Sequence, residues 1–243
     1  MSIYSTLVSK YNKSKVFALL IDPDKQTDES LKKLIGIANQ IGIDFFLLGG
    51  SLISQYTDSC VKIIKEYSNV PLVLFPGSLL QINSDADGIL LLSLISGRNP
   101  DFLIGNHVVA APLLKKSKIE TIPTGYILIE GGKVSSVEYM SNTKPIPSDK
   151  TDIAVATAIA GEMKGNKLIY LEAGSGAPTS VPTEIIKEVK QNISVPLIVG
   201  GGLKTRAQIK AVCDAGADIV VVGNAIEDQP ELLKGLVAET KTY

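Results

Sequence analysis

Short runs of apolar residues recur along the chain, and each is followed within a few residues by glycine, aspartate or proline. There are eight of them, at residues 16–21, 43–48, 71–75, 88–92, 125–129, 168–171, 196–199 and 218–222. Apart from Asp44 and Asp218 near the starts of two runs, they are apolar throughout and show no regular alternation with polar residues. Continuous apolar strands are typical of parallel sheets that are covered on both faces. The pattern therefore predicts eight buried, parallel strands.

The segments between these runs carry apolar residues at helical spacing, most clearly in residues 28–42, 183–192, 204–216 and 227–240. Cys213 falls on the apolar face of one such segment, so we expect it in the core. The segment between the third and fourth runs, "SLLQINSDAD", is shorter than the crossover of about a dozen residues that joins parallel strands. We therefore expect the helix after the third strand to be reduced or missing.

Eight strand–helix units in 243 residues predict one domain, residues 1–243, with an α/β fold of the (β/α)8 TIM barrel type and a reduced third helix. A doubly wound open sheet would also use parallel strands. No cluster of edge-strand signals marks the two ends of such a sheet, so closure into a barrel is favoured.

Composition excludes several classes of protein. The 24 basic and 25 acidic residues leave a net charge of −1, which argues against a nucleic-acid-binding protein and against a polybasic membrane anchor. Cys60 and Cys213 lack metal-ligand spacing, as expected of a reduced, cytoplasmic protein. The N-terminus is too polar for a signal peptide, and no apolar run approaches the ~18 residues of a transmembrane segment. Any contact with a membrane is expected to be transient.

Glycines gather after the last three predicted strands. The loops concerned carry Glu172, Gly174, Ser175 and Gly176, then Gly200, Gly201 and Gly202, then Gly223 and Asn224. Glycine lets backbone N–H groups approach a ligand closely, and late loops at the carboxyl end of a barrel commonly bind phosphate. These loops could simply turn the chain, but three in succession at the same end favour a phosphate site.

Glu172 is the best candidate for a general base, because it ends an apolar strand beside these loops. The single histidine, His107, lies in "IGNHVVAAP", and we expect a helical residue whose ring is satisfied by hydrogen bonding.

Asp22 directly follows the first strand, and Ser51 follows the second, in "GGS". One carboxylate, a hydroxyl and water suit Mg²⁺, which uses few protein ligands together with substrate phosphates. Asp22 could instead cap the turn before Pro23, and the spacing alone favours that role over a metal ligand. Asp24 and Lys25 are expected to face solvent or to order this loop.

The segment "YMSNTKPIP", residues 139–147, has two closely spaced prolines and is too rigid for a generic linker. It could form a lid or a wall over an apolar groove, or an ordered surface loop.

Six segments, "IDPDK", "LLGGS", "LFPGS", "YLEAGSGAP", "IVGGG" and "VVVGNAIE", together resemble the geranylgeranylglyceryl phosphate synthase family, also called the PcrB-like prenyltransferases. The resemblance runs in order from about residue 15 to about residue 235. It implies a modified barrel with a reduced third helix. It also implies the Mg²⁺-dependent transfer of a geranylgeranyl group from geranylgeranyl diphosphate to the C3 hydroxyl of sn-glycerol 1-phosphate, a step of ether lipid synthesis.

The resemblance carries over residue by residue. Asp22 and Ser51 match the Mg²⁺ positions of the family, and Glu172 matches its proposed base. The positions that match its glycerol phosphate site are Tyr170, Leu171, Glu172, Ala173, Gly174, Ser175, Gly176, Gly201, Gly202, Gly223 and Asn224. Members of the family form dimers or hexamers, so a homo-oligomer is expected here.

The loop after the sixth predicted strand reads "YLEAGSG". It is one residue longer than the loop of the bacterial members that transfer a heptaprenyl group, which is similar to "YLEYSG". The longer form is similar to a second group, found in archaea and some Bacteroidetes, and favours the C20 donor over a heptaprenyl one. A phosphosugar isomerase or lyase on the same barrel remains an alternative. Such an enzyme would need an acid–base pair or a Schiff-base lysine at the end of a strand, whereas Lys25, Lys133 and Lys204 all lie in polar loops. A non-catalytic phosphate-binding barrel would not need both Asp22 and Glu172.

Overall fold

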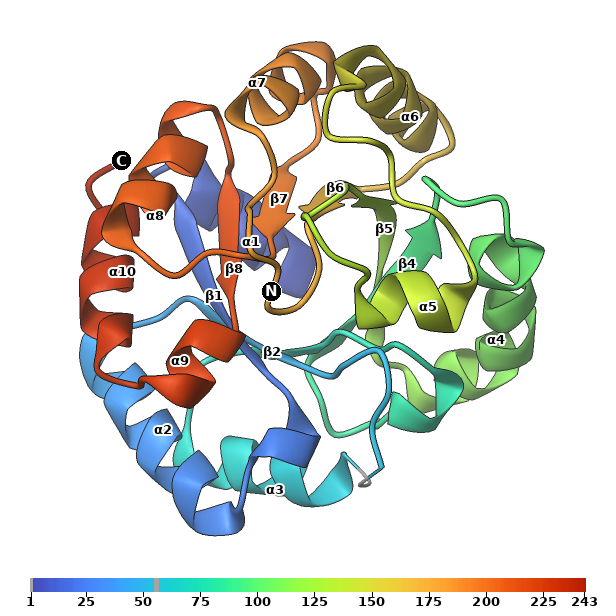
Figure 1. The fold of residues 1–243 in the computed structure, drawn as a ribbon. Coiled ribbons are helices and arrows are strands. Elements are labelled where there is room, and N and C mark those ends of the chain that lie inside the picture. The colour runs from blue at the N-terminus through green and yellow to red at the C-terminus, as the bar shows by residue number, and fades with distance from the viewer. Residues whose placement is uncertain (1, 55–56) are drawn as a thin grey trace.

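The computed structural model, which describes residues 2–54 and 57–243, contains a closed barrel of eight parallel strands in chain order (Figure 1). The strands are β1 (Val16–Ile21), β2 (Phe45–Leu48), β3 (Leu72–Leu74), β4 (Gly88–Leu94), β5 (Glu120–Leu128), β6 (Leu168–Glu172), β7 (Leu197–Gly200) and β8 (Ile219–Val222). β8 pairs with β1 and closes the barrel, so the prediction of a barrel is confirmed and the open sheet is wrong.

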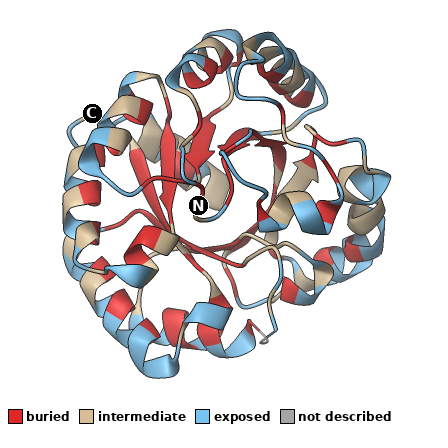
Figure 2. Cartoon of the chain, viewed as in Figure 1, coloured by how far each residue is buried: buried red, intermediate tan, exposed pale blue. Residues whose placement is uncertain are grey.

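Helices surround the strands, with buried residues on the side that faces the barrel and exposed residues on the outer side (Figure 2). They are α1 (Ile3–Tyr11), α2 (Asp28–Ile41), α3 (Asp58–Tyr67), α4 (Asn106–Ser117), α5 (Ser136–Ser141), α6 (Thr151–Met163), α7 (Thr183–Asn192), α8 (Arg206–Asp214), α9 (Asn224–Asp228) and α10 (Leu232–Thr240). Short helical turns occur at η1 (Pro23–Lys25), η2 (Leu79–Gln81) and η3 (Asp101–Gly105). Cys213 on α8 is buried, as predicted.

The connection from β3 to β4 contains only η2, so the expected reduction of the helix after the third strand is confirmed. A full helix in this position would cover the outside of β3 and β4.

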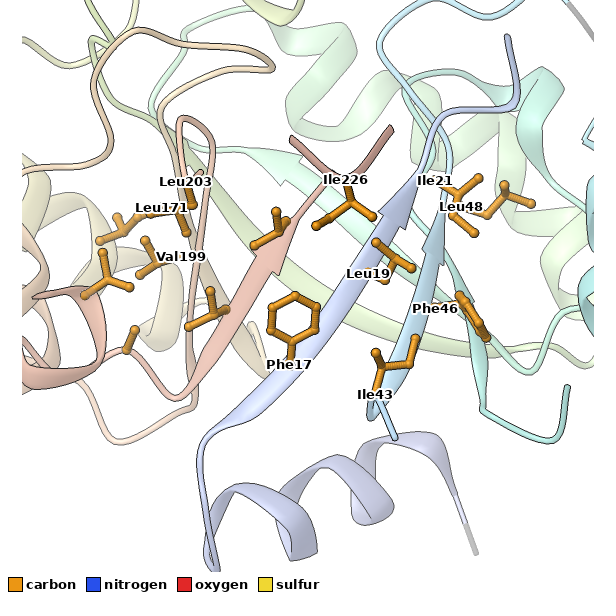
Figure 3. Packing of buried hydrophobic residues seen from close by; sticks show 14 of the residues in the cluster. Phe17, Leu19, Ile21, Ile43, Phe46, Leu48, Leu171, Val199, Leu203 and Ile226 are labelled. Atoms are coloured by element: carbon orange, nitrogen blue, oxygen red, sulfur yellow. The ribbon is translucent and has the colours of Figure 1, made fainter. Parts of the chain in front are cut away.

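Alternate side chains of each strand point to opposite faces of the sheet. On β1, Val16 and Ala18 pack inside the barrel, whereas Phe17, Leu19 and Ile21 pack outward against the helices. Figure 3 shows these outward side chains beside those of the neighbouring strands.

The same alternation decides which way the functional strand β6 presents its side chains. Tyr170 belongs to the inner cluster and Leu171 to the outer one. Glu172 is two residues beyond Tyr170, so it also faces inward, at the carboxyl end of the barrel.

The opposite end of the barrel is closed by α1, which lies behind the strands in Figure 1. Leu7 of α1 joins the inner cluster, and Tyr4 packs against it. The backbone N–H of Tyr4 donates a hydrogen bond to the Glu120 carboxylate at the start of β5, at 3.0 Å. The inside of the barrel is therefore accessible from its carboxyl end.

Candidate functional site

A polar cavity with about 930 Å³ of empty space lies at the carboxyl end of the barrel. Ten of the residues predicted from the sequence line it: Asp22, Ser51, Tyr170, Glu172, Ser175, Gly176, Gly201, Gly202, Gly223 and Asn224. Leu171, Ala173 and Gly174 do not line it, and the side chains of Leu171 and Ala173 pack in the outer hydrophobic layer. Only their backbone groups could serve a ligand here.

Glu172 is 5% exposed, at the floor of this cavity. Its Oε1 accepts a hydrogen bond from the backbone N–H of Gly174 at 2.7 Å. Burial raises the pKa of the Glu172 carboxyl to about 7, although the hydrogen bond from Gly174 opposes the shift. A carboxylate with a pKa near neutrality is suited to take up and release a proton.

The Tyr170 hydroxyl is buried close enough to the Glu172 carboxylate to lower the pKa of that group, but it makes no hydrogen bond of regular geometry to any residue that the structure describes. The ring is fixed by Tyr126, whose centroid lies 5.2 Å away, and by Phe75, at 5.4 Å. Burial and the nearby charge of Glu172 raise the pKa of Tyr170 well above its usual value, so the group stays a hydroxyl donor. A buried donor without a partner calls for an explanation, and a bound ligand in the cavity would supply one.

Two features of these loops require glycine: a positive backbone φ and the lack of space for a Cβ atom. Gly174, Gly176, Gly201 and Gly202 all have positive φ, between 64° and 101°. A Cβ on Gly201 would lie 2.3 Å from Oε1 of Glu172, and one on Gly200 would lie 2.3 Å from the Tyr170 hydroxyl. The glycines therefore let the backbone approach the two functional side chains.

A side-chain hydrogen bond joins two of these loops, from the Ser175 hydroxyl to Oδ1 of Asn224 at 2.6 Å. Two lysines contribute positive charge to the same region. Lys204 lines the cavity, and Nζ of Lys133 lies 3.7 Å from the position of a Cβ on Gly176. Sequence reasoning assigned both lysines to polar loops and missed their proximity to the glycines.

Glu227 is a third carboxylate in this cavity, beside those of Asp22 and Glu172, and sequence reasoning missed it. Its Oε1 accepts a hydrogen bond from the backbone N–H of Asp22 at 3.1 Å, and its Oε2 pairs with Lys25 at 2.8 Å. Burial raises the pKa of Glu227, and the charge of Lys25 opposes that shift. Lys25 therefore orders the loop, as predicted. The only signal in the sequence was the acidic residue three positions after Asn224.

Asp22 caps η1, since its Oδ1 accepts a hydrogen bond from the backbone N–H of Asp24 at 3.1 Å. It also lines the polar cavity with Ser51, and partial burial raises its pKa. Among the described residues no group of three or more His, Cys, Asp and Glu side chains could enclose a metal ion. One carboxylate and one hydroxyl facing an open cavity nevertheless fit Mg²⁺ held mainly by substrate phosphates and water.

A second, apolar cavity with about 890 Å³ of empty space adjoins the first. The residues that line both cavities are Gly50, Ser51, Phe75, Tyr126 and Val137. Its walls come from β4, η2, η3, α4 and α5, through apolar side chains such as Leu92, Phe102 and Leu114. His107 of α4 lies in this wall with its Nε2 2.7 Å from the carbonyl oxygen of Leu92, which confirms the prediction of a satisfied ring.

The proline-containing segment 139–147 is partly helical, because its first three residues belong to α5. Met140 and Ser141 line the apolar cavity, and Tyr139 is 80% exposed. Ile146 forms a bridge with Ile129 at the end of β5. The segment is thus a wall of the cavity in this structure.

No helix within residues 2–54 and 57–243 is long and apolar enough to cross a membrane.

Comparison with known proteins places these features in one family. A profile of the PcrB family matches residues 9–241. The geranylgeranylglyceryl phosphate synthase of Spirosoma linguale is 47% identical over 98% of this chain and 97% of its own. That of Thermococcus kodakarensis is 45% identical over 90% of this chain and 86% of its own. A crystal structure of (S)-3-O-geranylgeranylglyceryl phosphate synthase from Thermoplasma acidophilum, in complex with sn-glycerol-1-phosphate, superposes with a TM-score of 0.95 at 33% identity, over all of both chains.

Proposed function

This chain belongs to the PcrB family, and on that premise we propose that it transfers a geranylgeranyl group from geranylgeranyl diphosphate to the C3 hydroxyl of sn-glycerol 1-phosphate. The observation that carries the proposal is the junction of two cavities of different chemistry. One holds a buried carboxylate beside three glycine loops, and the other is apolar. The relative from Thermoplasma acidophilum, crystallised with sn-glycerol-1-phosphate, supports the assignment of the acceptor.

The polar cavity binds the acceptor. Backbone N–H groups around Gly176, Gly202 and Gly223 receive the phosphate, and the positive charges of Lys133 and Lys204 favour an anion there. The Tyr170 hydroxyl, buried and without a partner in the described structure, donates a hydrogen bond to the glycerol moiety.

The apolar cavity binds the prenyl chain. Each buried CH₂-sized group of the chain contributes about 0.8 kcal/mol, so a C20 chain gains most of its binding energy here. Because the cavities share Phe75 and Tyr126, the first carbon of the chain reaches the acceptor hydroxyl at that shared edge.

Glu172 accepts the proton of the C3 hydroxyl. The C3 oxygen forms a bond to C1 of the prenyl group while the bond from C1 to the diphosphate oxygen breaks, and its electron pair leaves with the diphosphate. Burial keeps the pKa of Glu172 close to 7. With this pKa the carboxylate is partly ionised at neutral pH and binds a proton more strongly than an ordinary glutamate does, as a general base requires. Orientation of the two substrates in adjoining cavities contributes much of the remaining acceleration.

Asp22 and Ser51 would hold Mg²⁺ at the edge where the diphosphate must lie. The chemistry that Mg²⁺ supplies when bound is neutralisation of the leaving diphosphate. Glu227 fixes the backbone of Asp22, and Lys25 balances the charge of both carboxylates.

The longer "YLEAGSG" loop favours the C20 donor over a heptaprenyl donor, and the names of the relatives agree with that choice. We also infer a homo-oligomer, dimeric or hexameric. The outer face of α4 supports this, since Val108 and Val109 are 65% and 67% exposed. Analytical ultracentrifugation would distinguish a monomer from either assembly.

The test is an incubation with labelled sn-glycerol 1-phosphate, Mg²⁺ and a series of prenyl diphosphates, followed by extraction of lipid product. We expect a product that is formed most efficiently with the C20 donor. A preference for the heptaprenyl donor would reassign the chain length. No product from any donor would favour the phosphosugar isomerase or lyase, or a non-catalytic phosphate-binding barrel.

A further inference from the structure

Gln81 is a buried polar residue that lines neither cavity. It lies in η2, the short turn that replaces the missing helix, and is 1% exposed. Its Oε1 accepts hydrogen bonds from the backbone N–H groups of Gly50 and Gly77, each at 3.2 Å. Its Nε2 donates to the carbonyl oxygen of Gly50 at 2.7 Å. One side-chain amide thus joins the loop after β2 to the loop after β3.

The two loops that Gln81 joins pack backbone against backbone. A Cβ on Gly49 would lie 2.1 Å from the carbonyl oxygen of Phe75, and one on Gly77 would lie 2.3 Å from that of Gly50. Such contacts leave no space for side chains to interlock and fix the loops. Hydrogen bonds must hold them instead, and Gln81, which lies in the same connection as Gly77, supplies three.

The joined loops lie where the two cavities meet. Gly50, Ser51 and Phe75 line both cavities, and Gly77 lines the apolar one. The neighbours of Gln81 along the chain, Leu79 and Ile82, also line the apolar cavity. The groups that Gln81 orders therefore lie along the apolar cavity and at its junction with the polar one, where the prenyl diphosphate is proposed to bind.

We propose that Gln81 is a positioning residue for the prenyl diphosphate: it takes over the role of the missing helix by holding the Gly50–Ser51 backbone in register with the loop at Gly77. The acceptor side of the site does not depend on it, because the loops after β6, β7 and β8 make no hydrogen bond with Gln81 in the described structure. The kinetic part of this proposal rests on the proposed prenyl transfer.

The first experiment does not depend on the reaction. Hydrogen exchange followed by NMR should show the Gly50 and Gly77 amides protected in the wild-type protein, and exposed to exchange in Gln81→Met, which keeps the length of the side chain and removes all three bonds. The Gly174 amide, bonded to Glu172, should be unaffected. Fast exchange at Gly50 and Gly77 in the wild type would overturn the proposal.

The second experiment measures steady-state kinetics with each substrate varied. In Gln81→Met we expect kcat/KM for geranylgeranyl diphosphate to fall about 100-fold, the loss typical of a displaced reacting group, and the half-saturating Mg²⁺ concentration to rise. The KM for glycerol phosphate should stay within about twofold, because independent sites couple weakly. Gln81→Asn, one methylene shorter, should show the same pattern and replaces Gln81→Met if that variant fails to fold.

Thr240→Val is the matched control, since it removes one buried hydrogen bond, from the Thr240 hydroxyl to the Leu236 carbonyl oxygen, on the distant helix α10. This control should lower the thermal stability about as much as the Gln81 variants do, while both KM values stay unchanged. Equal rises in both KM values of a Gln81 variant, or wild-type kinetics in Gln81→Asn, would overturn the positioning role. A wild-type protein that forms no product would overturn the proposed function, while the exchange experiment would still decide whether Gln81 joins the loops.

Discussion

The polar and apolar cavities of this barrel are built in different ways. The polar cavity is made largely by three short loops after consecutive strands, in which single residues are indispensable: Glu172 is buried, and Gly201 has a positive φ and no room for a side chain. The apolar cavity takes its walls from strands, helical turns and helices spread over some ninety residues, 50–141. Directed hydrogen bonds need particular atoms in particular places, whereas an apolar surface can be assembled from many combinations of side chains.

The difference predicts that substitutions in the polar cavity have large effects on chemistry or acceptor binding, and that substitutions in the apolar cavity have small effects on the donor alone.

Replacing Glu172 by Gln should lower kcat about 1,000-fold, since the amide cannot accept the hydroxyl proton, which is the usual scale for loss of a general base. Glycerol phosphate affinity, measured by calorimetry, should change little because the side chain keeps its size. Glu231→Gln, at an exposed carboxylate, is the control and should be fully active. Normal turnover of Glu172→Gln would show that another group takes the proton.

Replacing Asp22 by Ala should lower kcat/KM about 100-fold and abolish the saturable dependence of the rate on Mg²⁺, because the carboxylate that is proposed to hold the ion is lost. The measurement is a Mg²⁺ titration of the initial rate. Ser51→Ala should show a smaller rise in the half-saturating Mg²⁺ concentration. An unchanged titration in Asp22→Ala would leave Asp22 with only its capping role at η1.

Replacing Tyr170 by Phe should raise the KM for glycerol phosphate about tenfold, the equivalent of one hydrogen bond to the ligand. The free energy of unfolding, measured in urea, should be unchanged or higher, because the variant removes a buried hydroxyl that has no partner among the described residues. Tyr139→Phe, at an exposed tyrosine, should alter neither quantity. A large loss of stability in Tyr170→Phe would mean that the hydroxyl serves the fold.

Replacing Met140 by Ala should raise the KM for geranylgeranyl diphosphate about threefold and leave that for glycerol phosphate unchanged. The side chain lines the apolar cavity but is half exposed, so only part of its transfer free energy is lost. Met163→Ala, at an exposed methionine of α6, is the control. An effect on glycerol phosphate instead would contradict the separation of the two cavities.

The same difference explains how much of the molecule could be predicted from the sequence. Strand β1 was predicted at its observed bounds, because a buried parallel strand is apolar throughout. Strand β5 was predicted at residues 125–129 but extends over Glu120–Leu128, since its first half contains polar residues and Pro123, which weaken the strand signal. Pairing with the long strand β4 holds this half in the sheet despite its composition.

In the site, the residues in glycine motifs were predicted and nearly all of them line the polar cavity. Glu227 and Gln81 were not predicted, because each acts through hydrogen bonds to backbone groups that are distant in the sequence. Apart from the segment 139–147, the walls of the apolar cavity could not be predicted, since nothing in the sequence distinguishes Phe102 or Leu114 from a core residue.

The central claim is that the buried carboxylate of Glu172, at the polar side of the junction, takes the proton of the acceptor. The most direct test is the pH dependence of kcat/KM for glycerol phosphate. The base must be ionised to act, and burial places its pKa at about 7, so the rate should be low in acid, rise about tenfold per pH unit up to neutrality and level off above it. The phosphate of the substrate ionises near pH 6, so the residual rate of Glu172→Gln serves as the reference and should keep only that lower step. A wild-type profile that is flat across neutrality, or identical in shape to that of Glu172→Gln, would contradict the claim.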